Sequence, residues 1–367
     1  MLPKKFKETI FDKVSAITMR KFFNPIDLKN ADGLLREVLV QSQRDFFING
    51  TITSHAASPV LVAGMWMAGR EIALVNGHLS AWLKKAMGAA LSEVNKCPYC
   101  EDMLLSLTFG ANEKSLANAL KENDLNRIKN EKIKKIMEWV KASSTKYSKT
   151  LEEPPFTPAE MPEALGTLIV FGYTNRISDY TLNGSPVPWI GRDISLKLFG
   201  VELQESVQMD LKPGDSLDLL PEEQFPDDME WCLSNTLVSD SLARWNRVLE
   251  DNIAEVLSPE SIDCIRENLQ DWEGGLSPVS RGWVEDEVKS ISASERNKAR
   301  VALLVAKASY QIDDSLIQQL VSEGMNEFDL ISLGAWSAFM GAKTVANWCA
   351  NASKPENENL LTTAPAL

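Results

Sequence analysis

The chain has 367 residues, a formal net charge of −13 and 44% hydrophobic residues. That length exceeds what one hydrophobic core usually organises, so we expect two domains or a duplicated unit. The negative charge argues against a nucleic-acid-binding protein, which needs a basic face, and favours a neutral or hydrophobic small ligand over an acidic one.

Residues 1–50 are predicted to form an N-terminal helical extension. Phe6, Ile10, Val14 and Ile17 recur at helical spacing, with several lysines on the other face. We favour a helix docked on its own domain over a helix on a membrane surface, because membrane binding needs strong apolar insertion.

The longest stretch without Asp, Glu, Lys or Arg is 46–69, and it is interrupted by Asn, Gly, His and Pro residues. We therefore expect no membrane span. The sequence begins without an apolar signal segment, and its five cysteines include one close pair, which is not a secreted disulfide framework. A cytoplasmic location is the expectation.

The range 51–190 is predicted to be one helical domain. β-branched alternation is nearly absent, and apolar residues recur at helical spacing instead. The last helix of this range is apolar on most of its surface, so we expect it in the centre of a bundle. The predicted helices cover 58–75, 78–96, 97–111, 112–120, 130–144 and 163–182.

The range 191–239 is predicted to be an acidic, Pro-containing linker or an extended wrap over a neighbour, since 213–243 holds no Lys or Arg. Helical periodicity resumes over 240–352, and 353–367 is predicted to be a disordered tail. Two segments of the first half, KIMEWVKASS and GTLIVFGYTNRISDYTL, resemble ALLVAKASY and ISLGAWSAFMGAKTVANW in the second half. The chain is thus predicted to be an all-α helical bundle; a duplicated pseudo-dimer is one alternative, and a chance match of two generic helices is the other.

Two thiols, Cys97 and Cys100, stand two residues apart in CPYC at a predicted helix start. This spacing allows a small disulfide, and the helix dipole favours a thiolate near the helix start. The motif also occurs in glutaredoxins, but there it follows a β-strand, whereas here it follows an Ala-rich helical stretch. We predict thiol–disulfide redox chemistry at this pair.

Other metal or thiol sites are not predicted. Zinc would need two more ligands, and His55 and His78 lie in other segments without a recognisable second pair. Cys232, Cys264 and Cys349 stand alone and are expected to be small core residues.

The segment SEVNKCPYCEDMLLSLTFGANEKSLANAL resembles the core motif of the alkylhydroperoxidase D-like and carboxymuconolactone decarboxylase superfamily. FGYTNRISDYTL is similar to the Asn-Arg-containing last helix of its peroxidase-related branch, and the likeness covers about 58–182. The resemblance implies an all-helical homo-oligomer that reduces hydroperoxides. It implies that Cys100 attacks the peroxide and Cys97 resolves the product, with no bound cofactor and an external dithiol reductant protein.

The sequence departs from the family at its proton relay. The family has a His four residues after the second cysteine and a Glu twelve residues before the first, where this chain has Leu104 and Lys85. Glu93, one helical turn before the motif, is a candidate replacement base, and a solvated surface carboxylate is its other interpretation. Lys84 or Lys85 is a candidate for stabilising a thiolate.

Glu101 and Asp102 bring negative charge beside the motif, which opposes thiolate formation. An apolar substrate such as an organic hydroperoxide is expected near Trp66, Met67 and Trp82, residues that plain core packing also explains.

Two functions follow from the sequence. The first is a thiol-dependent peroxidase-like oxidoreductase using a CxxC dithiol cycle. The alternative is a non-catalytic ligand-binding or redox-sensing protein of the same fold that has lost the proton relay. Lactone decarboxylation fits poorly, because no His or Arg cluster can be assembled around the motif.

Overall fold

A computed structural model describes residues 18–24, 30–185, 187 and 190–353 of the chain. These residues form helices and no β-strand, with isolated bridges only at Met19–Leu182 and Thr145–Gly274. The all-α prediction is confirmed. The predicted basic helix face at Phe6 to Ile17 and nearly all of the predicted tail lie outside the described residues.

The described residues form a succession of helices. Their bounds are α2 Gly33–Asp45, α3 Gly50–Thr53, α4 Pro59–Ala68, the π-helical turn η1 Gly69–Leu74, α5 Ala81–Val94, α6 Pro98–Gly110, α7 Lys114–Lys121, α8 Glu131–Ala142, α9 Met161–Thr181, α10 Arg192–Gln208, α11 Thr236–Ile253, α12 Pro259–Gln270, α13 Gly282–Glu287, α14 Arg296–Ala308, α15 Asp314–Ser322 and α16 Glu327–Ala352. Short 3₁₀ turns are η2 Leu125–Arg127, η3 Lys149–Leu151, η4 Leu217–Leu219, η5 Asp227–Cys232 and η6 Ser309–Gln311.

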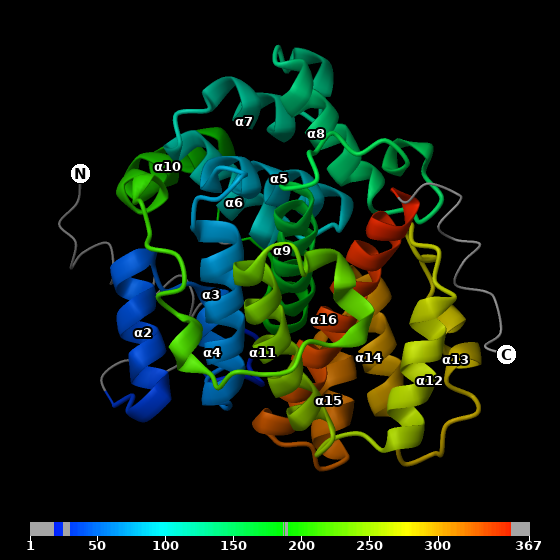
Figure 1. The fold of residues 1–367 in the computed structure, drawn as a ribbon. Helices are drawn as coiled ribbons and strands as arrows, with labels where there is room; N and C mark the ends of the chain where they lie inside the picture. The colour runs from blue at the N-terminus through cyan, green and yellow to red at the C-terminus, as the bar shows by residue number, and fades with distance from the viewer. Residues whose placement is uncertain (1–17, 25–29, 186, 188–189, 354–367) are drawn as a thin grey trace, which may run out of the picture.

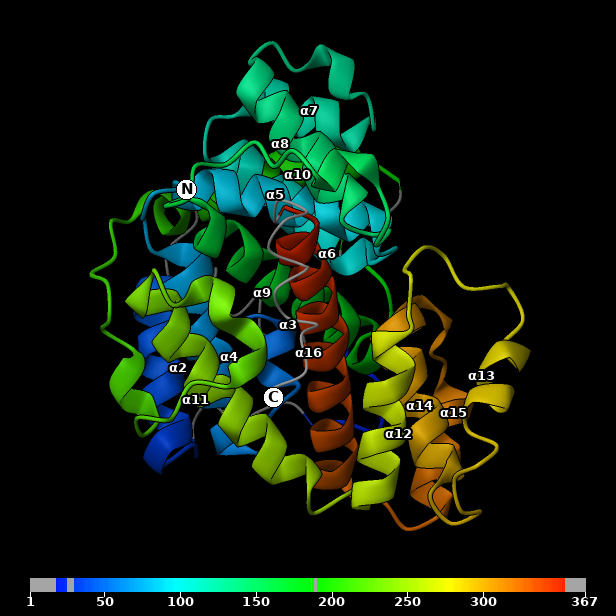
Figure 2. The same ribbon diagram turned by 45° about the vertical axis from the view of Figure 1, so that its right-hand side comes forward.

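Two long helices, α9 and α16, lie side by side at the centre of the bundle (Figures 1 and 2). α5 and α6 pack on α9, whereas α14 packs on α16, and α7 and α8 cover one end. Eighteen of the 21 residues of α9 are buried, as its apolar surface predicts. α9 and α16 come from the two ranges that resemble each other, so their pairing is the one that a duplicated chain would make. The duplication itself stays a prediction.

Glycines let α9 and α16 approach closely. A Cβ atom at Gly172 would lie 3.0 Å from the Cβ of Ala342, and one at Gly341 would collide with the backbone oxygen of Ala306. Arg176 of α9 donates from Nε to that same oxygen at 2.8 Å. The crossing therefore joins α9 to both α16 and α14.

The range expected as an acidic linker contains a 17-residue helix that the sequence did not predict, α10. It packs against α6, where a Cβ at Gly110 would lie 2.6 Å from the backbone oxygen of Gly200. Its outer face exposes Ile194, Leu198 and Val201. Helical periodicity is weak when apolar residues lie on both faces, which explains why the sequence reading missed α10.

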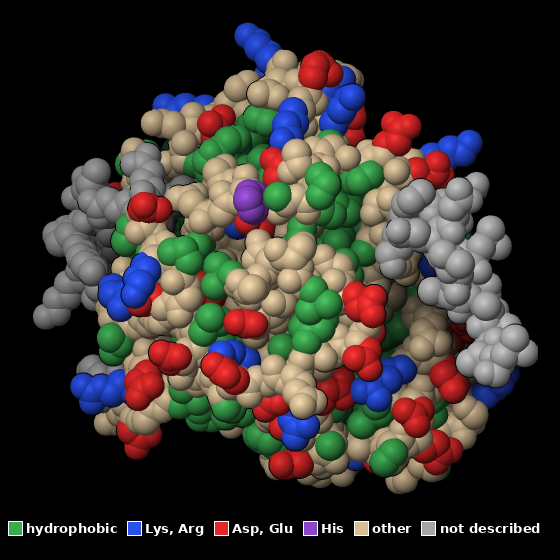
Figure 3. Space-filling view, in the orientation of Figure 1, with side chains coloured by type: hydrophobic (Ala, Val, Ile, Leu, Met, Phe, Trp, Pro, Cys, Tyr) green, Lys and Arg blue, Asp and Glu red, His purple; other side chains and the backbone are tan. Residues whose placement is uncertain are grey.

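Within the described residues, no helix has the length and apolarity needed to cross a membrane. Acidic and basic side chains are interspersed on the face shown in Figure 3, instead of forming a basic patch that would attract phosphate groups.

Gly341→Ala is expected to lower the free energy of unfolding by about 1–3 kcal/mol, because the added methyl group meets backbone atoms that cannot rotate away. Urea unfolding measures the change. Gly282→Ala is the matched control, because its Cβ would meet nothing closer than 3.4 Å. Equal stability of the two variants would contradict the close packing at this crossing.

Candidate active site

The CPYC motif forms the first turn of α6. Lys96 adopts a left-handed conformation with φ of 60°, which turns the chain after α5, and the backbone N–H of Cys97 then donates to Ser92 O at 3.0 Å. Cys97 is the N-cap residue of α6, and Pro98 opens the helix. Both thiols are free, close together and buried, with exposed fractions of 0% for Cys97 and 5% for Cys100.

Cys100 lies in the first turn of α6 and faces α9. Its Sγ is 3.4 Å from the backbone oxygen of Thr174 and 3.4 Å from Oγ of Ser178. Cys100 also lines a pocket.

The pocket has a volume of about 110 Å³. For comparison, an engineered apolar cavity of about 150 Å³ binds benzene. Its walls come from distant segments: Phe46, Phe47, Asn49, Thr51, Ile52, Met65, Trp66, Gly69, Ala73, Leu74, Lys85, Tyr99, Cys100, Met103, Leu104, Leu107, Val170, Phe171 and Thr174. Of the three side chains expected near a substrate, Trp66 lines this pocket, whereas Met67 and Trp82 do not.

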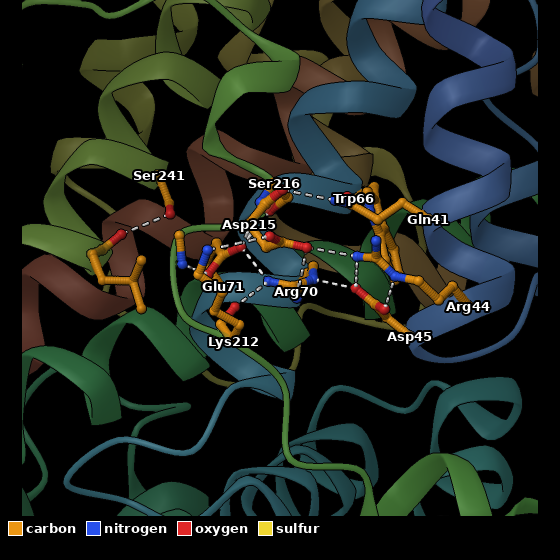
Figure 4. Close-up of polar contacts among 12 residues, drawn as sticks. Gln41, Arg44, Asp45, Trp66, Arg70, Glu71, Lys212, Asp215, Ser216 and Ser241 are labelled. Atoms are coloured by element: carbon orange, nitrogen blue, oxygen red, sulfur yellow. Dashed lines mark hydrogen bonds and ion pairs between the residues drawn. The ribbon is translucent and has the colours of Figure 1, made fainter.

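A buried ion-pair network holds one wall of the pocket (Figure 4). Arg70 donates from Nε to Asp45 at 2.6 Å and from Nη1 to Glu71 at 2.5 Å, and all three side chains are at most 5% exposed. Phe46 and Phe47 follow Asp45 directly. The network therefore fixes the end of α2, and with it the two aromatic rings, against η1.

The acidic range wraps over this network. Glu71 accepts hydrogen bonds from the backbone N–H of Gly214 at 2.8 Å, from that of Ser216 at 3.0 Å and from its Oγ at 2.6 Å (Figure 4). Lys212 accepts from Arg70 at 3.1 Å through its backbone oxygen. This part of the expected linker thus lies against the first half of the chain and closes the outside of the pocket wall.

Cys97 is not among the residues that line the pocket, and its thiol contacts Asp179. Burial, reinforced by Cys100 and the charge of Asp179, raises the pKa of the Cys97 thiol well above its ordinary value. The thiol in turn stabilises the Asp179 carboxylate by hydrogen bonding. Cys97 is therefore a protonated thiol with a proton acceptor beside it.

Asp179 is held by a residue from the second half of the chain. Oγ of Ser309, in the turn after α14, donates to Asp179 Oδ2 at 2.7 Å. Burial raises the pKa of Asp179 to about 7. Hydrogen bonds from Ser309 and Cys97 and the charges of Arg176 and Arg20 act in the opposite direction and lower this pKa, but burial is the larger effect. A carboxyl group with this pKa can accept or release a proton near neutral pH.

Asn175 and Arg176 of α9 connect this helix to α5 and α14. Asn175 donates to Ser92 Oγ at 2.8 Å and accepts from Asn95 at 2.8 Å, which ties α9 to α5 just before the motif. Arg176, which binds α14, completes the contact between the two halves.

Both departures from the family relay line the pocket. Leu104 contributes an apolar side chain, and Lys85 is only 2% exposed. Burial, together with the charge of Lys84, lowers the pKa of Lys85 to about 7. Lys84 itself forms an ion pair with Glu163 at 2.9 Å, so the two lysines have different surroundings.

Glu93 is engaged by lysines. Its carboxylate accepts from Lys141 at 2.9 Å and from Lys96 at 3.2 Å. Burial alone would raise the pKa of Glu93, but these hydrogen bonds and charges lower it below its ordinary value. A carboxylate with a lowered pKa is a weak base, and its role as replacement base stays a prediction.

Glu101 and Asp102, the acidic residues that follow Cys100, both bind Arg192. Asp102 accepts from Nε of Arg192 at 2.7 Å, and Glu101 accepts from Nη2 of the same residue at 3.0 Å. Ser185 also donates to Asp102. Arg192 is the first residue of α10, so the unpredicted helix supplies the positive charge that offsets the unfavourable effect expected beside Cys100.

The two histidines and the other three cysteines lie in different environments. His55 is buried and hydrogen-bonded between Thr51 O and Tyr173 OH, both at 2.6 Å, and burial lowers its pKa to about 4. His78 is exposed. The described residues contain no group of three or more His, Cys, Asp or Glu side chains that could hold a metal ion. Cys232 and Cys349 are buried, and Cys264 is half-buried.

Comparison with known proteins gives one informative relative. The protein named alkyl hydroperoxide reductase Rv2159c from Mycobacterium tuberculosis is 25% identical over 344 residues, which cover 91% of this chain and 97% of that protein. No protein-family model matches the chain, and no solved structure matches it significantly. The similarity extends through both halves of the chain and is not confined to the CPYC region.

Lys85→Met is expected to stabilise the protein most at and below pH 7. Between about pH 7 and 10.5 the unfolded lysine binds a proton that the folded one releases, so native stability rises with pH across this window. The advantage of the variant should therefore shrink by about 1 kcal/mol per pH unit above pH 8. Urea unfolding at pH 7 and 9.5 measures it.

Lys96→Met is the control, because this lysine is 46% exposed. A pH-independent effect of Lys85→Met would mean that Lys85 is not buried as described.

Proposed function

We propose that the protein is a thiol-dependent peroxidase that reduces an apolar hydroperoxide through a Cys97–Cys100 dithiol cycle. The observation that carries the proposal is the difference between the two thiols. Cys100 opens on an apolar pocket, and Cys97 is buried beside a carboxyl group with a pKa of about 7. The resemblance of the CPYC region and the hydroperoxide-reductase name of the M. tuberculosis relative support the same class.

In the first step, the Cys100 thiolate attacks the terminal peroxide oxygen. The O–O bond breaks, the alcohol leaves after taking a proton, and Cys100 becomes a sulfenic acid. The first turn of α6 and the Ser178 hydroxyl, 3.4 Å from the sulfur, stabilise the thiolate.

In the second step, Cys97 resolves the sulfenic acid. Its proton moves to Asp179, and its sulfur attacks the sulfur of Cys100. Asp179 then passes the proton to the departing hydroxide, so water leaves as the disulfide forms. In this chain Leu104 and Lys85 occupy the positions of the family's relay His and Glu. Asp179 serves as the proton acceptor instead. Ser309 keeps the Asp179 carboxylate turned toward the thiol.

An external dithiol then reduces the disulfide, so no bound cofactor is required. A thiol reductant protein, a homo-oligomeric assembly and a cytoplasmic location belong to the same proposal, since a reducing compartment keeps the pair available as thiols.

The test is peroxide consumption with cumene hydroperoxide and dithiothreitol. Cys100→Ser should abolish it, whereas Cys97→Ser should consume about one equivalent of peroxide rapidly and then slow, because no internal disulfide can form. Turnover unaffected by Cys100→Ser would contradict the proposal.

Asp179→Asn is expected to slow disulfide formation by about 10²–10⁴-fold, because an amide cannot take the Cys97 proton. Stopped-flow fluorescence after one equivalent of peroxide measures this step. Glu93→Gln is the control and should leave the rate within about twofold. The reverse ranking of the two variants would assign the base role to Glu93 instead of Asp179.

The second candidate is a redox-sensing or ligand-binding protein without turnover, which the Leu104 and Lys85 replacements favour. In that case the dithiol would oxidise stoichiometrically in both the native protein and Asp179→Asn, with equal rates and no repeated consumption of peroxide.

A further inference from the structure

Lys85 is a buried cation without an acidic partner among the described residues. Its Nζ has one hydrogen bond, at 3.4 Å, to the backbone oxygen of Ala81 in its own helix. The adjacent Lys84, by contrast, pairs with Glu163 at 2.9 Å and donates to Val75 O at 3.1 Å. Burying an ammonium group without a counter-ion is costly, so Lys85 needs either to lose its proton or to gain an anion.

The pocket that Lys85 lines can supply such an anion. Its walls are mostly aromatic and aliphatic, and the residues that line it include no Asp or Glu. Its volume of about 110 Å³ limits the ligand to a small molecule. Gly69 lies in the π-helical turn of the pocket wall. A Cβ atom added at Gly69 would meet nothing within 4 Å, so there is open space beside this residue.

We propose that this pocket selects small anionic ligands, with the hydrocarbon part against the apolar wall and a carboxylate paired with Lys85. The inference rests on the proposed function for its substrate: a peroxy acid, or a hydroperoxide that carries a carboxylate. It reverses the preference for neutral ligands expected from the net charge, because a single buried cation outweighs a distant, screened negative surface.

With a peroxy acid, the positions of Lys85 and Cys100 in one pocket match the charges of the reaction. The Cys100 thiolate bonds to the terminal oxygen, the O–O bond breaks, and its electron pair leaves on the carboxylate. The terminal hydroxyl becomes part of the sulfenic acid. The leaving carboxylate is the anion that Lys85 binds, so the cation stabilises charge where it develops.

The experiment measures binding of hexanoate and hexanamide, which share shape and differ in charge, to the full-length Cys100→Ser protein by ligand-detected NMR at pH 7. Hexanoate is expected to bind at least about tenfold more tightly. Lys85→Met should remove that ratio while keeping hexanamide binding, and Lys96→Met should leave it unchanged. Equal affinities in the parent protein, or a ratio that survives Lys85→Met, would overturn the inference.

Gly69→Leu locates the ligand. The added side chain extends into the open wall of the pocket, so binding of both ligands should fall, with circular dichroism confirming that the variant is folded. A folded Gly69→Leu protein that binds hexanoate normally would put the ligand elsewhere and overturn the inference. Charge-selective binding without peroxide turnover would refute the proposed function alone, and turnover without charge selectivity would refute this inference alone.

Discussion

The close crossing of α9 with α16 and α14 is the constraint on which the site depends. Gly172 and Gly341 remove the side chains that would hold the helices apart, and Arg176 closes the contact by binding the backbone oxygen of Ala306. Because Ser309 follows α14 directly, the same contact places its hydroxyl on Asp179. This hydrogen bond to Asp179 therefore comes from a residue more than a hundred positions further along the chain.

This arrangement gives the second half of the chain a role that its sequence does not suggest. The second half contributes no cysteine to the CPYC motif. Through Ser309, however, it holds the carboxyl group beside Cys97. The range between the halves contributes as well, since Arg192 neutralises the acidic pair beside Cys100, and residues 212–216 cover Glu71 behind the pocket wall. The CPYC motif is therefore local in sequence, but its electrostatic environment is assembled from both halves of the chain and the range between them.

The sequence predicts the helical fold and the thiol pair because both signals are local: apolar periodicity for helices, and CxxC spacing at a helix start for the thiols. It misses α10, whose exposed Ile194 and Leu198 blur the amphipathic pattern. It also misses Asp179, although a carboxylate in an otherwise apolar central helix was a usable signal. It names Glu93 as base from proximity along the chain, but lysine pairing at its carboxylate can be seen only in three dimensions. The pocket had no local signature, because its walls come from five separate segments.

The central claim is that Cys97 and Cys100 form one redox unit, with Cys100 attacking and Cys97 resolving. The most direct measurement is the intact mass and peptide map of the reduced protein after one equivalent of hydroperoxide. The account predicts the loss of two hydrogen atoms and a single disulfide between Cys97 and Cys100. Added oxygen retained on Cys100 with Cys97 still free, or an unchanged mass, would contradict it.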